Sequence, residues 1–354
     1  MRLYIAGGCG EHGRNCFMLD FGDDAVLVDC GLGQDALNPE YPRLTDEQIR
    51  KVRCVFLTHS HSDHVDALPW FFSRGGVRRA VASRETFEQL DFDIEEKIPL
   101  DALGGRLDRL GLAVEHGRTG HCIGAVWYAF EKDGKRALFS GDYIEETAVY
   151  ANDPIRGRHA DIAVLDCAYG REDVVHTRQC AKLVSLLRDC AQSRRKCFLP
   201  VPKYGRSVEL LALIKGELPE VRVAAEEGVF KAICEIAQQK EWLKSGTELS
   251  GLAEAFDGGS DFDVLLIGDG QLKKQRNRDI ADAIIAGGGT GIITGTPDKG
   301  SYIERLMDGG LMTRVRYPVH QCMAQFERLM SLNSFDRAIP YHSPELKSEP
   351  SFDF

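Results

Sequence analysis

The sequence predicts an α/β protein with a mostly parallel sheet, and the pattern is clearest in the second half of the chain. Strand-like apolar runs at 197–201, 262–267 and 291–294 are each followed by a helical pattern, at 207–215, 280–286 and 303–307. Such alternation is typical of parallel strands joined by crossover helices. The chain has 354 residues, 43% of them hydrophobic, which suffices for one large domain or two medium ones.

The first part of the chain has a different pattern of predicted secondary structure. Strand-like runs at 2–6, 16–21, 25–28 and 52–57 alternate with glycine-rich corners, and helical patterns are scarce. The strand–helix alternation begins near Val175 and ends near Thr313. The chain then continues with a strand at 315–318, a helix at 324–332 and a strand at 338–341. Residues 345–354 have the composition of a loose tail.

Composition excludes several classes of protein. The longest purely apolar runs are a few residues, far below the ~20 needed to cross a bilayer, and no basic and then apolar leader follows Met1. The 11 cysteines form no Cys-x-x-Cys pair, which indicates reduced thiols rather than a disulfide scaffold. We therefore expect a soluble, cytoplasmic protein with no membrane partner. The net charge of −10 argues against non-specific coating of nucleic acid, although the acidic excess lies in residues 1–175.

The segment Thr-His-Ser-His-Ser-Asp-His at 58–64 carries the strongest chemical signal. It follows the apolar strand at 52–57, and side chains two positions apart in an extended segment point the same way. His59 and His61 therefore face one point, and Asp63 and His64 continue toward it as the chain turns into a helix. A lone histidine is more often a core or surface residue, but this cluster of metal-capable groups predicts a metal site.

Three later residues are candidates for further ligands. His121 stands between small residues in Gly-His-Cys-Ile-Gly, Asp142 follows the apolar run 137–139, and His342 follows the strand at 338–341. Taken singly, each has an ordinary alternative: a loop histidine, a turn residue and a tail residue.

Together these residues resemble the metallo-β-lactamase superfamily, whose His-x-His-x-Asp-His signature matches residues 59–64. The opening Gly-Gly-Cys-Gly-Glu-His-Gly-Arg-Asn-Cys at 7–16 is similar to the first motif of the β-CASP nucleases, the branch that includes ribonuclease J and the mRNA 3′-end cleavage factors. Segments at 165–170, 200–211 and 294–300 agree with that branch in order and spacing. The resemblance covers nearly the whole chain. It implies an αββα sandwich with an inserted α/β domain, the β-CASP domain, of mostly parallel sheet.

Carried over by position, the resemblance implies two zinc ions. The ligands of the first are His59, His61 and His121, those of the second are Asp63, His64 and His342, and both ions share the bridging Asp142. Imidazole nitrogen and carboxylate oxygen suit zinc, and manganese competes for the more oxygen-rich second site. A water between the ions, its pKa lowered toward ~7, is the implied nucleophile for in-line attack on phosphorus, with Asp63 also orienting it.

The resemblance also pairs Asp166, in the family's motif A, with His320 in motif B. Asp166 would fix the imidazole tautomer so that His320 protonates the leaving oxygen or stabilises the charged phosphate. The family usually has Ser-Gly-His or Ser-Ala-His here, whereas this chain has Pro-Val-His. A histidine that merely precedes the helix at 321–332 is the alternative. His342 matches motif C, where histidine is typical of RNA-directed members and valine of DNA-repair members.

The domain organisation implied by the resemblance is a metallo-β-lactamase domain at 1–175 and 313–354, interrupted at 176–312 by the β-CASP domain, which roofs the active site in the family. Lys203, Arg206 and Ser207 lie between a strand and a helix start, and Thr296 lies in a second such loop. A helix N-terminus with glycine and a cation nearby is a ready phosphate site. We therefore expect these residues to bind substrate phosphates, although a short charge run is more often only a solvated face.

The expected function is hydrolysis of single-stranded RNA by a zinc-dependent phosphodiesterase. The alternatives are a DNA nuclease of the same family, a hydrolase of small esters, thioesters or lactones, and a catalytically inactive RNA-binding subunit. The large inserted segment argues against a small-molecule hydrolase, and the intact ligand set argues against an inactive subunit. The sequence names no protein partner and leaves homo-oligomerisation open.

Overall fold

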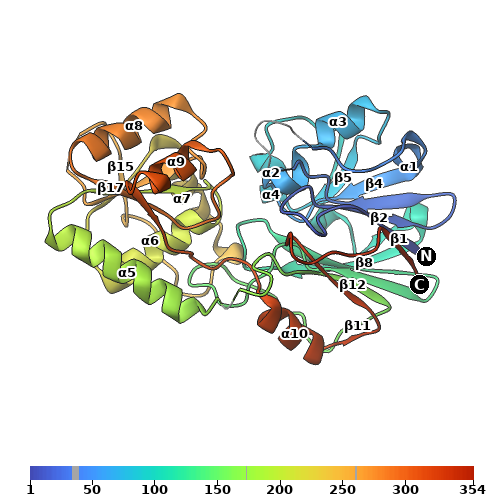
Figure 1. Ribbon diagram of the computed structural model, residues 1–354. Helices are drawn as coiled ribbons and strands as arrows, with labels where there is room; N and C mark the ends of the chain where they lie inside the picture. The colour runs from blue at the N-terminus through green and yellow to red at the C-terminus, as the bar shows by residue number, and fades with distance from the viewer. Residues whose placement is uncertain (34–39, 173, 260) are drawn as a thin grey trace. The chain divides into compact units, whose positions relative to one another are not determined.

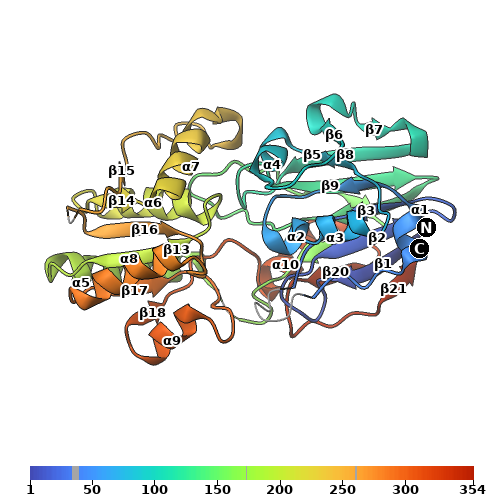
Figure 2. The same ribbon diagram turned by 90° about the horizontal axis from the view of Figure 1, so that it is seen from above.

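The computed structural model describes residues 1–33, 40–172, 174–259 and 261–354 of the chain. These residues form two compact units (Figures 1 and 2). Unit 1 consists of Met1–Glu145, Asn152–Asp173 and His320–Phe354, and unit 2 consists of Glu146–Ala151 and Val174–Val319. Within the described ranges, no helix is long and apolar enough to span a membrane.

Unit 1 contains two large sheets. The first has the strand order β21-β1-β2-β3-β4-β5-β6. Its strands are β1 (Arg2–Gly7), β2 (Cys16–Asp20), β3 (Ala25–Val28), β4 (Val52–Phe56), β5 (Arg79–Ala82), β6 (Glu96–Pro99) and β21 (Ser351–Asp353).

The second sheet of unit 1 has the order β20-β12-β10-β9-β8-β7. Its strands are β7 (Arg106–Leu107), β8 (Leu112–Arg118), β9 (Val126–Lys132), β10 (Lys135–Phe139), β12 (Ile162–Asp166) and β20 (Ala338–Tyr341). A short parallel pair is formed by β11 (His159–Ala160) and β19 (Ser334–Phe335).

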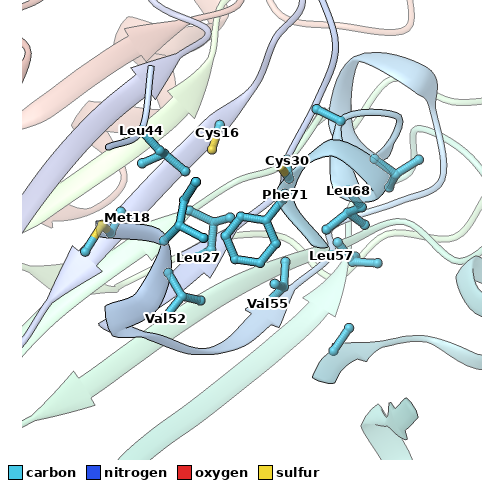
Figure 3. Packing of buried hydrophobic residues seen from close by; sticks show 14 of the residues in the cluster. Cys16, Met18, Leu27, Cys30, Leu44, Val52, Val55, Leu57, Leu68 and Phe71 are labelled. Atoms are coloured by element: carbon cyan, nitrogen blue, oxygen red, sulfur yellow. The ribbon is translucent and has the colours of Figure 1, made fainter. Parts of the chain in front are cut away.

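Helices cover the outer face of the first sheet. They are α1 (Asp46–Lys51), α2 (Ser62–Val65), α3 (Leu68–Ser73) and α4 (Arg84–Gln89). Their apolar side chains join one buried cluster with residues of the sheet, and the ring of Phe71 lies beside Leu27 and Val55 in this cluster (Figure 3). Burial of a side chain of this size contributes about 1.5–3 kcal/mol, so this cluster supports the strands that carry the site.

The inner faces of the two sheets pack against each other. The ring centroids of Phe17 and Phe139 are 5.9 Å apart, and those of Phe56 and Phe130 are 4.9 Å apart, each pair joining the first sheet to the second. On the outer face of the second sheet, α10 (Met323–Ser331) buries Phe326. The layers are therefore helix, sheet, sheet and helix, and the expected αββα sandwich is confirmed.

Unit 2 is a doubly wound sheet with the order β15-β14-β16-β13-β17-β18, and each strand pair in it runs parallel. Its strands are β13 (Cys197–Val201), β14 (Val223–Ala225), β15 (Glu254–Ala255), β16 (Val264–Gly268), β17 (Thr290–Ile293) and β18 (Met312–Arg314). Its helices are α5 (His176–Gln192), α6 (Arg206–Glu217), α7 (Glu227–Gln238), α8 (Gln275–Ala286) and α9 (Tyr302–Asp308). Figure 1 shows α5 and α6 on one face and α8 and α9 on the other. The predicted mostly parallel sheet is confirmed.

Single 3₁₀ turns complete the described elements, at Leu100–Ala102, Asp108–Leu110 and Lys240–Trp242.

The short excursion Glu146–Ala151 belongs to unit 2, which the sequence pattern did not indicate. It is held by the buried carboxylate of Glu209 in α6, which accepts the backbone N–H groups of residues 148–150 at 2.7, 2.9 and 3.2 Å. The hydroxyl of Tyr317 donates to the same carboxylate at 2.8 Å. Glu209 therefore fixes both the excursion and the last residues of the unit.

The C-terminal part differs from the expectation in three ways. The return to unit 1 begins at His320 instead of 313, because β18 pairs with β17 and keeps the chain in unit 2. The expected strand at 315–318 is absent, although the N–H groups of Val315 and Tyr317 donate to the carbonyls of Ile293 and Thr294, both at 3.0 Å. The expectation of a loose tail at 345–354 is wrong, because β21 pairs with β1 and Phe352 is buried beneath the guanidinium of Arg337.

Candidate metal centre

The predicted ligands of the second sheet lie at one edge because several strands end there. β10, β12 and β20 run parallel, so the residues at their carboxyl ends emerge at the same edge. Asp142 follows β10, Asp166 is the last residue of β12, and His342 follows β20. His121 lies in the loop that leads into β9, and β9 begins at this edge because it is antiparallel to β10.

The first sheet contributes residues 58–64, which follow β4. The carbonyl of Thr58 accepts the N–H of Val126 at 2.9 Å, and this bond joins the end of β4 to the start of β9. His61 is the N-cap residue of α2, and Asp63 and His64 lie within that helix. The two sheets thus bring together all seven residues that the sequence analysis assigned to metals.

The first cluster consists of His59, His61, His121 and Asp142, whose potential ligand atoms all lie within 4.8 Å of one another. Nε2 of His121 is 3.2 Å from Nδ1 of His61. Oδ2 of Asp142 is 3.4 Å from Nε2 of His59 and 3.5 Å from Nε2 of His121. Three imidazoles and one carboxylate oxygen therefore face one point.

The second cluster consists of Asp63, His64 and His342. Nε2 of His342 is 3.0 Å from Oδ2 of Asp63. The other oxygen of Asp142, Oδ1, is 3.2 Å from Nε2 of His64 and 3.3 Å from Nδ1 of His342. Because its two oxygens face different clusters, Asp142 has the geometry of a bridging ligand.

Two residues that the sequence analysis missed, Asp29 and Thr58, support the ligands. Oδ2 of Asp29 lies 2.7 Å from Nδ1 of His64, and its Oδ1 accepts the N–H of Thr58 at 2.7 Å. The carboxylate can only accept, so the proton of His64 sits on Nδ1 and Nε2 is left for a cation. Asp29 directly follows the apolar strand β3, which is the same signal that identified Asp142.

Backbone conformation also shapes the site. A Cβ at Gly31 would lie 1.6 Å from the carbonyl oxygen of Asp63, so only glycine lets the loop after β3 pass over that residue. His342 has a φ of 72°, which is unusual for a residue with a side chain. Its N–H donates to the carbonyl of Gly8 at 2.6 Å, and this bond helps to hold the strained conformation.

The two clusters differ in electrostatics. Burial, and then the neighbouring His64, lower the pKa of His59 to about 4, and burial lowers the pKa of His121 well below its usual range. For His64 and His342 burial also acts to lower the pKa, but nearby carboxylates, Asp142 first, outweigh it. They raise the pKa of His342 to about 10 and that of His64 well above its usual range. The second cluster therefore attracts positive charge strongly.

The donor set fits divalent transition-metal ions. Two ligand atoms that are each about 2.1 Å from one ion, at angles of about 90–110°, lie about 3.0–3.4 Å apart. The separations of 3.2–3.5 Å in the first cluster match this spacing. In the second cluster, the 3.0 Å between His342 and Asp63 and the 3.2 Å between His64 and Asp142 match it as well. Imidazole nitrogen with carboxylate oxygen is also the chemistry that such ions prefer.

Asp166 and His320 form the pair that the sequence suggested. Nδ1 of His320 is 3.1 Å from Oδ2 of Asp166, which is fully buried. The backbone N–H groups of Tyr143 and Ala168 also donate to Asp166, each at 3.0 Å. The carboxylate of Asp166 is therefore fixed in position. Because it contacts Nδ1 of His320, Nε2 of that ring faces away from Asp166. The ring centroids of His320 and His121 are 4.7 Å apart.

The four residues suggested for phosphate binding lie in unit 2, apart from the metal clusters in the chain. Lys203 and Thr296 are exposed, and Arg206 is the first residue of α6. Ser207 differs, because it is fully buried and its hydroxyl donates to the carbonyl of Lys203 at 2.8 Å. Arg314, which the sequence analysis did not single out, donates to the hydroxyl of Thr296 at 3.4 Å.

Comparisons with known proteins show the family to which the chain belongs. A family model described as "Metallo-beta-lactamase superfamily" matches residues 9–200, more than half of the chain. A protein of Drosophila melanogaster named cleavage and polyadenylation specificity factor 73 is 25% identical over 252 residues, which are 60% of this chain and 35% of that protein. An RNase J-like protein of Methanocaldococcus jannaschii is 24% identical over 267 residues, which are 68% of this chain and 62% of that protein.

A ribonuclease of Thermus thermophilus is 25% identical over 237 residues, which are 60% of this chain and 54% of that protein. The chain thus spans less than two thirds of the length of each of these relatives. A crystal structure of a protein of unknown function from Enterococcus faecalis matches this chain with a TM-score of 0.58 at 13% identity. The match covers 99% of this chain and 96% of the other chain, which shows that the two share a fold. The chain belongs to the metallo-β-lactamase superfamily, in its β-CASP branch.

Proposed function

We propose that this protein is a metal-dependent phosphodiesterase that hydrolyses single-stranded RNA. The observation that carries the proposal is the position of Asp142, whose two oxygens face two separate groups of ligand atoms. The proposal assigns zinc to both positions, with manganese as the competing ion at the second. The names of relatives, a ribonuclease and an RNase J-like protein, support RNA as the substrate.

When bound, ions at these positions would supply Lewis acidity and an activated water for attack on phosphorus. The chain supplies the positioning. Asp142 holds the two ligand groups at a fixed separation, and Asp29 keeps the proton of His64 on Nδ1. Asp63 offers a carboxylate beside His342 that can accept a proton from the attacking water.

His320 is the proposed proton donor to the leaving oxygen. Its Nδ1 is engaged by Asp166, so Nε2 is the nitrogen that can serve substrate. Its side chain is 13% exposed, whereas that of Asp166 is fully buried, so solvent and substrate reach the imidazole but not the carboxylate. Asp166 is then a positioning residue that fixes the tautomer and orientation of His320.

Replacement of His320 separates this role from metal binding. His320→Ala should retain the metal content of the parent protein and slow RNA cleavage by about 10²–10⁴-fold, because general acid catalysis typically contributes that much. Metal analysis and single-turnover cleavage measure the two effects. His159→Ala, at an exposed histidine of β11, is the control. Loss of metal from His320→Ala would make His320 a ligand instead.

Unit 2 is proposed to bind backbone phosphates of the RNA through Lys203, Arg206 and Thr296. Lys203 and Thr296 lie in loops after β13 and β17, and Arg206 is the first residue of α6; all three are at the carboxyl edge of a parallel sheet, where such folds bind ligands. The guanidinium of Arg206 packs against Gly295, where a Cβ would lie 2.6 Å from its Nη1. Ser207 contributes by shaping the start of α6, since its hydroxyl is already bonded to the backbone.

The double substitution Lys203→Ala with Arg206→Ala tests this surface. It should weaken RNA binding and reduce the slope of log affinity against log salt by about one to two, because each phosphate contact to single-stranded RNA adds ~0.7 to that slope. Binding titrations at several salt concentrations measure it. Lys231→Ala with Lys240→Ala, at exposed lysines of unit 2, is the matched control. An unchanged slope would show that Lys203 and Arg206 are ordinary solvated surface residues that bind no phosphate.

The deciding experiment for the function uses 5′- and 3′-labelled single-stranded RNA and DNA, each with and without a chelator. We expect chelator-sensitive cleavage of RNA. Cleavage confined to DNA would show a DNA nuclease. Hydrolysis of nitrophenyl esters without nucleic-acid cleavage would show a hydrolase of small esters. Cleavage that persists after complete metal removal contradicts the mechanism.

A further inference from the structure

Asn15 lies beside the second ligand cluster and has a fixed position there. Its side chain is fully buried. Its backbone N–H donates to the carbonyl of Asp63 at 2.9 Å, and its carbonyl accepts the N–H of Gly31 at 2.9 Å. The backbone therefore holds the side chain against the ligands.

The amide of Asn15 has an unbalanced set of contacts. Its Nδ2 is 2.8 Å from Nε2 of His64 and 3.4 Å from Oδ2 of Asp63. Its Oδ1 is buried and makes no hydrogen bond to any residue that the structure describes. It points toward Gly8, where a Cβ would lie only 2.7 Å from it. A buried acceptor without a partner costs about 1–3 kcal/mol, so this orientation is unfavourable for the oxygen.

This orientation is also incompatible with a cation on His64. Nδ1 of His64 is engaged by Asp29, so Nε2 is the nitrogen that would bind a cation. An amide N–H directed at this nitrogen competes with that cation. Rotation of the amide by half a turn exchanges its nitrogen and oxygen, which have nearly the same shape.

After this rotation, Oδ1 occupies the place of Nδ2 and faces both His64 and Asp63. Separations of 2.8 and 3.4 Å are close to the 3.0 Å between Asp63 and His342. They are also close to the about 3.0–3.4 Å expected between two ligands of one ion. The oxygen then stands where a cation at the second position requires a donor.

We propose that Asn15 is an additional ligand of the second metal ion and binds it through Oδ1. The proposal rests on the metal centre of the proposed function. It adds a neutral oxygen to a site that already has the oxygens of Asp63 and Asp142. Oxygen-rich sites with more than four ligands favour manganese over zinc, which prefers four. Asn15 would thus bias the second position toward the harder ion.

The test measures metal affinity and needs no RNA. Metal-free parent, Asn15→Asp and Asn15→Leu proteins are titrated with Mn²⁺ in competition with a chelator, and the free ion is followed by electron paramagnetic resonance. If Oδ1 is a ligand, Asn15→Asp places a carboxylate oxygen on the ion and binds Mn²⁺ about tenfold or more tightly. Asn15→Leu should bind it about 10–100-fold more weakly.

A carboxylate at this position attracts a cation even without binding it, so the decisive variant is Asn15→Leu. Unchanged Mn²⁺ affinity of Asn15→Leu overturns the proposal. Absorption spectra of the Co²⁺-loaded proteins provide a second readout, because removal of a ligand in Asn15→Leu should shift the spectrum toward that of a four-coordinate ion. An unchanged spectrum contradicts the assignment.

Controls separate this result from folding and from the proposed function. Thermal unfolding of the metal-free variants shows whether they fold, and Asn15→Ser replaces Asn15→Leu if the latter does not. If the parent protein does not cleave RNA, the change in Mn²⁺ affinity of the variants can still be measured. Conversely, normal RNA cleavage together with unchanged Mn²⁺ binding by Asn15→Leu would overturn the role of Asn15 alone.

Discussion

Asp142→Asn should reduce RNA hydrolysis by at least about 10³-fold and lower the bound metal below two ions per chain. The substitution keeps the size of the side chain but removes its charge and one of its two acceptor oxygens. Each oxygen of Asp142 faces a different ligand group, so the change weakens both positions. A factor of 10³ corresponds to about 4 kcal/mol, which is reasonable for loss of metal-assisted charge stabilisation.

Metal analysis after dialysis and initial rates on labelled RNA measure the effect of Asp142→Asn. The hydroxyl of Tyr341 also donates to Asp142, at 3.1 Å, so unfolding midpoints are needed to show that the variant folds. Asp133→Asn, in the exposed turn between β9 and β10, is a matched acid-to-amide control. A folded Asp142→Asn protein with two ions and activity within tenfold of the parent would rule out the bridging role.

Glu209→Ala should destabilise the protein by at least about 3 kcal/mol. Two of the backbone N–H groups that Glu209 accepts, those of Val149 and Tyr150, belong to buried residues and would lose their acceptor. The hydroxyl of Tyr317 would lose its partner as well. Each buried polar group left without a partner costs about 1–3 kcal/mol. Urea unfolding, followed by circular dichroism, measures the loss.

Two variants calibrate the effect of Glu209→Ala. Tyr317→Phe removes only one of the hydrogen bonds to Glu209 and should cost about 1 kcal/mol. Glu217→Ala, at the exposed end of the same helix, should change stability by less than about 0.5 kcal/mol. If Glu209→Ala behaves like Glu217→Ala, the carboxylate does not hold the excursion at 146–151.

The metal ligands could be predicted because their signal is local. His59, His61, Asp63 and His64 lie within six residues of each other after an apolar strand, and the structure keeps them together. The more distant residues His121, Asp142 and His342 were only candidates on their own, and the family resemblance implied their assignment as ligands. His342 was the hardest of these, because its place depends on the parallel pairing of β20 with β12.

Other features depend on contacts that a sequence does not reveal. Asp29 had the same strand-end signal as Asp142, but it lies far from the histidines in the chain and so was not connected with them. Glu209 was noticed only as part of a motif, and its partners at 148–150 lie about 60 positions earlier. The tail was misread because a three-residue strand, β21, has too few residues to show an alternating pattern.

The path of the chain between the two units has a consequence for synthesis. Unit 1 is built from three segments, and its last segment brings both β20 and His342. During translation, β12 can pair with β10 on one side, but its other edge stays open until residues 338–341 leave the ribosome. Unit 2, by contrast, is fully encoded by residue 319. The nascent protein therefore completes its inserted unit first, and it cannot assemble the full metal centre until residue 342 has been made.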